Sequence, residues 1–482
     1  MKSDVLLIQC DQMNPFYAPP YGDATAIMPG VSRLANEGVV FENAYCNNPL
    51  CAPSRASMFS GRLVSNLRCA FDNGSEFSSE IPTFAHMLNS AGYRTVLSGK
   101  MHFIGPDQRH GLAERLTTDI YPSDFVWSPA GWNSETPTHP DMGSRAYDYA
   151  GSCEENVQLE YDEMVHRRGV DRLKELLRDD SPFCMIVSYT HPHPPFMCPP
   201  EYFQLYDGAD VKPPEPGSAE ASLDEFNEFI MWTCGFRKEV PQDLRRRILQ
   251  SYYGMLTYVD DKVSELLALV DRHPERDVTV IFTSDHGEMM GRYGLHQKRT
   301  YYEDSVRIPL VVRNDKRFSP HRVDAPVSLV DLFPTLADLS DTDWPWTETD
   351  GRSFTPLLAG ETDDSRSVIS EYYGECIPYP YRLVVRDGLK FVQFPGGEQS
   401  DLLFETGSVP EKRVEVSDPG FAETTRRLRE ELEEDYDHQT LVDLVAESHR
   451  NRARIRGTYG NFRPDWNFGE TEEERQRFIR GK

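Results

Sequence analysis

Acids, imidazoles and a lysine follow four apolar segments that have the pattern of β-strands. These polar groups are Asp-Gln at residues 11–12, Gly-Lys-Met-His at 99–102, His-Pro-His at 191–193 and Asp-His-Gly at 285–287. In an open α/β sheet, ligands bind beyond the carboxyl ends of the strands. Each group alone would be ordinary loop chemistry, but four of them at strand ends predict one catalytic or metal-binding site at the edge of a sheet.

Oxygen donors dominate two of these groups. Asp11, Gln12 and Asp285 offer the oxygen ligands that Ca²⁺ and Mg²⁺ prefer, and we expect Ca²⁺ first. His286 adds a nitrogen donor, which keeps Mn²⁺ as an alternative. A turn or a helix cap would explain Asp11 or Gln12 taken alone. The presence of Asp285 at the same predicted edge favours a divalent metal site.

The thiol of Cys51 lies where a helix is about to begin. Pro53 suits the first turn of a helix, so Cys51 precedes the positive end of the helix dipole, and Arg55 faces the same side one turn later. This setting favours a thiolate nucleophile. Cysteine phosphatases, however, space their Cys and Arg more widely, and a cysteine protease would leave the metal ligands unexplained. From these residues alone, an ordinary buried cysteine remains an open alternative.

The elements that would hold these groups alternate between short apolar runs and helical stretches. This pattern indicates an α/β fold with a large, mostly parallel sheet. The predicted strands are residues 5–10, 95–98, 184–189, 278–283 and 308–312. The predicted helices are residues 29–37, 82–91, 242–272 and 328–339.

The pattern changes after about residue 370. Two apolar runs joined through Asp387-Gly388 indicate an antiparallel hairpin, and a charged helix is predicted to follow it. We therefore expect an α/β catalytic domain over residues 1–370. A smaller α+β subdomain, with an antiparallel sheet and a helix, is expected over residues 371–482.

Charge, apolar runs and cysteine content indicate which binding partners and which cellular compartment to expect. The 482-residue chain has a formal net charge of −27, which disfavours nucleic acid and anionic lipid as partners. No apolar run approaches the roughly 18 residues of a membrane span, and the start MKSDVLLIQCDQ lacks the features of a signal peptide. The nine cysteines are scattered without a CxxC pair, which favours a reducing compartment. These observations predict a cytoplasmic protein.

Residues 51–55, Cys-Ala-Pro-Ser-Arg, resemble the C-x-P-S-R signature of the type I sulfatases in the alkaline phosphatase superfamily. The strand-end motifs occur in that family's order, and Lys298 and Arg-Ile-Pro-Leu at 307–310 follow them. The resemblance spans nearly the whole chain. It implies the family's fold, a sheet sandwiched by helices, and the activity of a sulfuric ester hydrolase. It also implies that a formylglycine-generating enzyme oxidises Cys51 to formylglycine.

The resemblance further implies a role for each motif residue. One hydroxyl of the hydrated aldehyde, activated by the metal and Arg55, would attack sulfur and give a covalent sulfo-enzyme. Lys100, Lys298 and the metal would stabilise the transferring group, and His193 or Lys298 would protonate the departing alcohol. His102 would remove the proton of the second hydroxyl as the aldehyde re-forms. The implied metal ligands are Asp11, Gln12, residue 51, Asp285 and His286.

Within the family, residues 97–129, 161–165 and 190–196 look like those of the choline sulfatases. Trp127 falls where that branch has an aromatic that recognises the quaternary ammonium group, and Glu375 resembles its carboxylate. The resemblance therefore implies choline-O-sulfate or another small sulfate ester as the substrate. It also implies a homo-oligomer.

The ending of the chain, residues 461–482, does not match the C-terminal tail that brings a further acid in the choline sulfatases. Two alternatives therefore stay open beside a choline-specific enzyme. The first is a phosphonate monoester or phosphodiester hydrolase on the same scaffold, a group that Gln12 also fits. The second is a catalytically inactive binding homologue with an unmodified Cys51.

Overall fold

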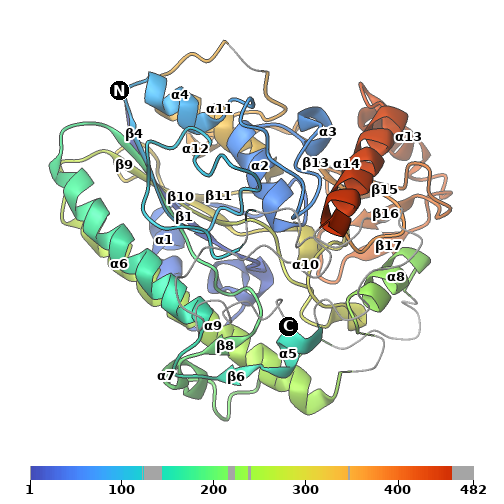
Figure 1. Ribbon diagram of the computed structural model, residues 1–482, viewed down its shortest axis with the longest axis horizontal. Helices are drawn as coiled ribbons and strands as arrows, with labels where there is room; N and C mark the ends of the chain where they lie inside the picture. The colour runs from blue at the N-terminus through green and yellow to red at the C-terminus, as the bar shows by residue number, and fades with distance from the viewer. Residues whose placement is uncertain are drawn as a thin grey trace.

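The computed structural model describes residues 2–121, 123, 144–214, 223–236, 240–345 and 348–458. Within these residues, the largest sheet has eight strands in the order β11-β2-β10-β9-β1-β7-β4-β5 (Figure 1). Its strands are β1 (Asp4–Cys10), β2 (Val39–Phe41), β4 (Arg94–Gly99), β5 (Glu114–Arg115), β7 (Phe183–Ser188), β9 (Val278–Ser284), β10 (Leu310–Arg313) and β11 (His321–Val323).

The central strands run parallel. β1 pairs in parallel with β7 and β9, and β4 pairs in parallel with β7 and β5. β10 runs antiparallel to both β9 and β2. It begins at Leu310 rather than at the predicted Ile308, because Pro309 has no N–H for the ladder and the N–H of Ile308 donates to the carbonyl of Ala44. The predicted fold class, a mostly parallel sheet flanked by helices, is confirmed.

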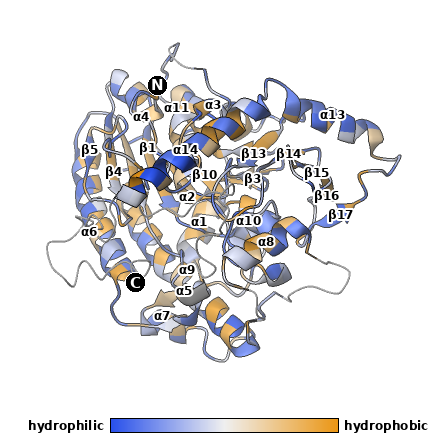
Figure 2. Ribbon diagram, turned by 45° about the vertical axis from the view of Figure 1, so that its right-hand side comes forward, coloured by the Kyte–Doolittle hydropathy of each residue, from blue (hydrophilic) through white to orange (hydrophobic). Residues whose placement is uncertain are grey.

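Helices cover both faces of this sheet, with α1, α6 and α9 packed together on one side and α2, α4 and α11 on the other (Figure 1). These helices are α1 (Pro29–Glu37), α2 (Cys51–Ser60), α4 (Phe84–Ser90), α6 (Val157–Arg178), α9 (Gln242–Asp271) and α11 (Leu332–Leu339). Every residue of β1, β7 and β9 is buried, and the central strands are mostly orange in Figure 2. Cover on both faces explains their continuous apolar runs.

A second, antiparallel sheet follows, in the order β13-β14-β15-β16-β17 within the described residues. Its strands are β13 (Val368–Tyr372), β14 (Tyr381–Arg386), β15 (Leu389–Gln393), β16 (Leu402–Glu405) and β17 (Lys412–Val414). Asp387 and Gly388 have φ values of 53° and 73°, as a tight hairpin turn between β14 and β15 requires. Helix α13 (Ala422–Glu433) packs Leu428 and Leu432 against this sheet. The antiparallel C-terminal sheet is confirmed, and the domain boundary at residue 370 stays a prediction.

Helix α14 (His438–Thr458) has no counterpart in the sequence-based prediction. It returns to the part of the chain that carries the large sheet, where Leu441 joins Phe71 in a small apolar cluster. Nη1 and Nη2 of Arg452 donate to the carboxylate of Asp72 at 2.9 and 2.6 Å. The last helix of the described residues is therefore anchored next to the large sheet's helical layer rather than to the small sheet alone.

Shorter elements complete the described part of the chain. They are η1 (Pro15–Tyr17), η2 (Pro19–Tyr21), β3 (Ala44–Tyr45), α3 (Val64–Leu67), α5 (Ser144–Asp148), β6 (Gly151–Ser152), β8 (Met197–Cys198), α7 (Pro200–Gln204), α8 (Glu225–Thr233), η4 (Arg292–Gly294), α10 (Glu303–Val306), β12 (Val327–Ser328), η5 (Leu329–Asp331) and α12 (Thr355–Leu358). No helix among the described residues combines the length and the apolar character that crossing a membrane requires.

Candidate active site

The residues after β1 and β9 meet the first residue of α2 at one point. The ligand atoms of Asp11, Cys51, Asp285 and His286 all lie within 4.8 Å of one another, and all four side chains are buried. β1 and β9 are parallel neighbours, with Cys10 opposite Ser284, so Asp11 and Asp285 leave the sheet side by side. The structure therefore brings together four of the side chains that the sequence assigns to a metal site.

Cys51 is the first residue of α2. Its Sγ lies 3.2 Å from Nε2 of His286 and 3.8 Å from Oδ1 of Asp11. The N–H of Ala52, one of the donors that a helix start leaves without a helical partner, donates to Oδ1 of Asn73 at 3.0 Å. The side chain at position 51 is thus held at the positive end of a helix dipole. It lies against the carboxylates of Asp11 and Asp285, which we call the acidic cluster.

Two buried cations balance the two carboxylates. Nε of Arg55 donates to Oδ2 of Asp285 at 2.7 Å, and its Nη1 donates to Oγ of Ser188 at 2.9 Å. The Lys100 ammonium donates to the carboxylate of Asp11. A buried charge without a partner costs several kcal/mol, so these contacts hold each group in place. The result is a rigid set of opposite charges around residue 51.

The cations also change how the acidic groups titrate. Burial opposes ionisation of the Cys51 thiol, but Lys100, Lys298 and His286 outweigh it and hold its pKa well below the usual range. Burial, together with the neighbouring Asp285, raises the pKa of Asp11 to about 6. The cations around residue 51 therefore favour an anionic group at that position.

Two predicted catalytic histidines lie beside an aromatic residue that the sequence reading missed. The ring of Tyr121 stacks on His102, with a centroid distance of 4.8 Å, and lies 5.8 Å from the ring of His193. Nζ of Lys100 is 4.2 Å from the centre of the same ring. His193 Nδ1 lies 2.6 Å from the carbonyl oxygen of Pro194. Because a carbonyl only accepts, Nδ1 carries the hydrogen in this contact, and the neutral ring has its acceptor nitrogen at Nε2.

We expect Tyr121→Phe to lower kcat by about three- to tenfold, the usual worth of one hydrogen bond. The Tyr121 hydroxyl lies 3.2 and 3.4 Å from the two ring nitrogens of His193, and phenylalanine removes it while keeping the ring. The pH–rate profile checks the assignment, since the limb that reports His193 should move. Tyr121→Leu, which also removes the stacking surface, should cost more. An unchanged pH profile would reduce the tyrosine to a packing role.

Gln12 and Lys298 meet next to the acidic cluster. Gln12 follows Asp11 in the left-handed region, with φ at 68°, and its N–H donates to Oδ1 of Asp285 at 3.0 Å. The Lys298 ammonium donates to Oε1 of the Gln12 side chain. Both side chains are buried. The structure therefore joins Gln12 to the predicted site through both its backbone and its side chain.

Of the two predicted substrate ligands, Glu375 and Trp127, the structure describes only Glu375. Glu375 forms a buried ion pair with Arg299, with Oε1 at 2.7 Å from Nη2. This pairing weakens its attraction for a cationic substrate, and its role as a substrate ligand stays a prediction. Trp127 lies outside the described residues. His191, which we interpret as a structural neighbour of His193, places Nδ1 at 2.6 Å from Oδ2 of Asp162 in the interior.

The donor set fits a divalent metal ion. Asp11 and Asp285 supply carboxylate oxygens, Gln12 supplies an amide oxygen and His286 an imidazole nitrogen. Oxygen-rich sets of this kind suit Ca²⁺ or Mg²⁺, and the imidazole is compatible with Mn²⁺. The buried carboxylates of Asp11 and Asp285 have ligand atoms within 4.8 Å of one another and repel each other. A bound cation would reduce this repulsion.

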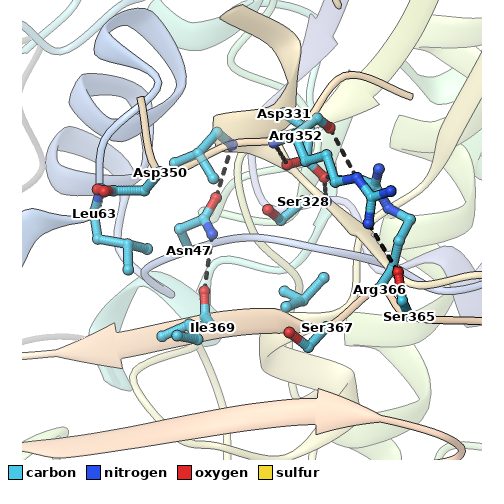
Figure 3. Close-up of a pocket in the computed structure, with 12 residues that line it drawn as sticks. Asn47, Leu63, Ser328, Asp331, Asp350, Arg352, Ser365, Arg366, Ser367 and Ile369 are labelled. Carbon is cyan, nitrogen blue, oxygen red and sulfur yellow. Dashed lines mark hydrogen bonds and ion pairs between the residues drawn. The ribbon is translucent and has the colours of Figure 1, made fainter. Parts of the chain in front are cut away.

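A separate pocket of about 230 Å³ lies away from these residues, beside β13 (Figure 3). Of the two arginines that line it, Arg366 donates to Oδ2 of Asp331 at 2.7 Å and to the carbonyl of Arg352 at 2.8 Å. Asn47 accepts from the N–H of Val330 and donates to the carbonyl of Ile369, so its side chain links two of the lining segments. None of the predicted site residues lines this pocket, and the Arg366 guanidinium that faces it already pairs with Asp331.

Protein-family comparisons match most of the chain. A family described as Sulfatase matches residues 3–342, and one described as N-sulphoglucosamine sulphohydrolase, C-terminal, matches residues 291–438. A choline-sulfatase of Rhizobium meliloti (strain 1021) is 38% identical over 403 residues, which cover 80% of this chain and 77% of that protein. An uncharacterized sulfatase, YidJ, of Escherichia coli (strain K12) is 30% identical over 83% of this chain and 80% of its own length.

Solved structures share the fold at lower identity. A phosphonate monoester hydrolase from Silicibacter pomeroyi superposes with a TM-score of 0.70 at 22% identity, over 91% of this chain and 96% of that one. A protein solved in complex with its substrate D-glucosamine-2-N,6-O-disulfate has a TM-score of 0.69 at 18% identity, over 94% of this chain and 99% of its own. At these identities the likeness concerns the fold.

Proposed function

Since the chain belongs to the sulfatase family and is a sulfuric ester hydrolase, we propose that its substrate is a small sulfate monoester, with choline-O-sulfate as the first candidate. The observation that carries the proposal is the position of residue 51, at the start of α2, between the acidic cluster and the cations Arg55 and Lys100. The similarity to a choline-sulfatase over most of the chain supports the choice of ester.

Two groups complete the proposed site. Oxidation of Cys51 by a formylglycine-generating enzyme, followed by hydration, would supply a geminal diol as the nucleophile. A divalent ion, Ca²⁺ before Mg²⁺ or Mn²⁺, would supply Lewis acidity and would be held by the residues predicted for it. These are Asp11, Gln12, residue 51, Asp285 and His286.

The chain's own residues then divide the remaining work. Arg55 helps to activate the nucleophile at position 51, and Lys100 and Lys298 bind the sulfuryl oxygens and offset the charge that develops on them. His193 Nε2 delivers a proton to the departing alcohol, with Lys298 as the alternative donor. His102 removes a proton at position 51 to release sulfate, and burial suits it to this role because it lowers the pKa of the imidazole and keeps the ring neutral.

The proposal also covers the location, the oligomeric state and the domain organisation of the enzyme. No disulfide joins any two of the described cysteines, which supports a cytoplasmic location. The resemblance to the choline sulfatases supports a homo-oligomer. The change from the parallel to the antiparallel sheet supports a division into a catalytic domain, residues 1–370, and a C-terminal subdomain, residues 371–482.

A substrate panel tests the proposal. We expect kcat/KM for choline-O-sulfate to exceed that for an aryl sulfate and for an aryl phosphonate monoester by at least about tenfold, because a site shaped for one ester discriminates on that scale. The measurement is initial rates on purified protein with the metal present. Preference for the aryl sulfate would remove the choline assignment and keep the sulfatase. Strong preference for the phosphonate would overturn the sulfate ester as substrate.

Trp127→Ala is the companion variant for the panel. A cation over an indole face is worth about 1–2 kcal/mol, so the loss should raise KM for choline-O-sulfate by roughly tenfold. An uncharged alkyl sulfate of similar size is the control substrate and should be almost unaffected. Equal losses on the two esters would identify Trp127 as a packing residue.

A further inference from the structure

We infer that Glu288 is a positioning residue that fixes which way the carboxamide of Gln12 faces and so presents the amide oxygen to the cation site. This inference rests on the proposed role of Gln12 as a metal ligand. Glu288 is fully buried, and neither the predicted metal set nor the predicted catalytic set contains it. It follows the Asp-His-Gly motif directly, two residues after His286.

The backbone of Gln12 is held on both sides. Its N–H donates to Asp285, and its carbonyl accepts from the hydroxyl of Tyr252 at 3.1 Å. These contacts locate the residue and leave the final side-chain torsion undetermined. A carboxamide has two orientations that exchange its oxygen and nitrogen, and they are almost equal in shape. The neighbours of the side chain therefore decide whether Gln12 offers an acceptor or a donor.

The Glu288 carboxylate is surrounded by donors. Its Oε1 accepts from the N–H of Gln297 at 2.6 Å and from the N–H of Met290 at 3.1 Å. Its Oε2 accepts from the hydroxyl of Tyr147 at 3.1 Å and from the side-chain nitrogen of Gln12. An ionised carboxylate has only acceptors, so the partner that faces it must be the amide nitrogen.

Lys298 imposes the same choice from the opposite side. Its ammonium has only donors, so the Gln12 atom that meets it must be the oxygen. Exchanging the amide ends would place donor against donor at Lys298 and acceptor against acceptor at Glu288. A buried polar group that loses its partner costs about 1–3 kcal/mol. Glu288 and Lys298 therefore select one orientation, with Nε2 toward Glu288 and Oε1 toward Lys298.

This pairing also explains why position 12 carries an amide rather than an acid. A carboxylate at position 12 would face the buried carboxylate of Glu288, and two like charges in contact disfavour ionisation of both. In the observed pair, only Glu288 is charged, and the Gln12 amide donates to its carboxylate. The same donor–acceptor match results if the two residue types exchange places. A glutamine at position 288 could donate to a glutamate at position 12 and still accept from the N–H of Gln297.

The test compares Ca²⁺ affinity, measured by calorimetry on metal-stripped full-length protein, across Glu288→Gln and the exchanged double variant Q12E/E288Q. Glu288→Gln should weaken Ca²⁺ binding by about 10- to 100-fold, the usual effect of losing a partner that orients a ligand. The exchanged variant should bind at least about tenfold more tightly than Glu288→Gln. Since the double variant restores the pair, it keeps the test decisive even if the single variant folds poorly.

Two controls separate the possible failures. Glu303→Gln removes another fully buried carboxylate, one that accepts from Lys390 at 2.9 Å, and should leave Ca²⁺ affinity unchanged. Gln12→Ala tests the ligand itself: if it leaves Ca²⁺ affinity unchanged, the proposed role of Gln12 fails. If Gln12→Ala weakens binding while Glu288→Gln does not, or if the exchanged variant binds no better than Glu288→Gln, the positioning role of Glu288 is overturned.

Discussion

Cys51→Ser abolishes sulfate ester hydrolysis and leaves the fold intact: this is the expected result for a chain whose nucleophile is made from the thiol at position 51. The loss of kcat should be on the order of 10⁴-fold or more, as for removal of a nucleophile elsewhere. Serine conserves the volume of the side chain and the contact with His286, so the thermal midpoint should change little.

The physical reason lies in how the covalent intermediate is released. A geminal diol has a second hydroxyl, and removal of its proton by His102 expels sulfate as the aldehyde re-forms. A serine ester at position 51 has no such exit and would need a separate attack by water.

The assay is kcat on choline-O-sulfate, combined with the peptide mass around residue 51 in the parent protein. Cys184→Ser is the matched control, because Cys184 is buried in β7 and burial alone raises its pKa to about 12. This control should keep activity. Turnover retained by Cys51→Ser, or an unmodified thiol in fully active parent protein, would contradict the role of residue 51.

The central site was predictable because its residues sit at the ends of strands. Apolar runs that alternate with helical stretches predict a mostly parallel sheet, and the carboxyl ends of parallel strands meet at one edge, so Asp11 and Asp285 could be placed together from the sequence. The position of Cys51 followed from the helix signal of Pro53. In each case a local pattern carried the information, and the structure has the corresponding element.

What the sequence could not predict depends on contacts between distant segments. Tyr121 and Glu288 belong to no periodic pattern, and their importance appears only when His193 and Gln12 lie against them. The ion pair of Glu375 joins it to a residue 76 positions away in the chain. A strand pattern also carries no direction, so the antiparallel course of β10 could not be read from its apolar residues.

Asp285→Asn should remove metal binding and activity together and also destabilise the fold. Oδ2 of Asp285 accepts from Nε of Arg55 at 2.7 Å, and Oδ1 accepts from the N–H of Gln12 at 3.0 Å. Asparagine has one acceptor oxygen and one NH₂ group. It can therefore accept from only one of the two donors, and its NH₂ group would face the other. Breaking a buried ion pair on one side costs about 3–5 kcal/mol of folding free energy. We expect kcat/KM to fall by about 10³-fold or more, the scale of losing a key electrostatic group.

Elemental analysis of metal content, thermal unfolding and kcat/KM should be measured on the same preparation. Asp277→Asn is the matched control, since Asp277 precedes the same strand at its opposite end and pairs with Arg317 at 2.8 Å. It should change stability slightly and leave metal content intact. Normal metal content in Asp285→Asn, with only the stability lowered, would mean that Asp285 anchors Arg55 and does not bind the ion. Joint loss of ion and turnover, with Asp277→Asn unaffected, would tie both to the carboxyl end of β9.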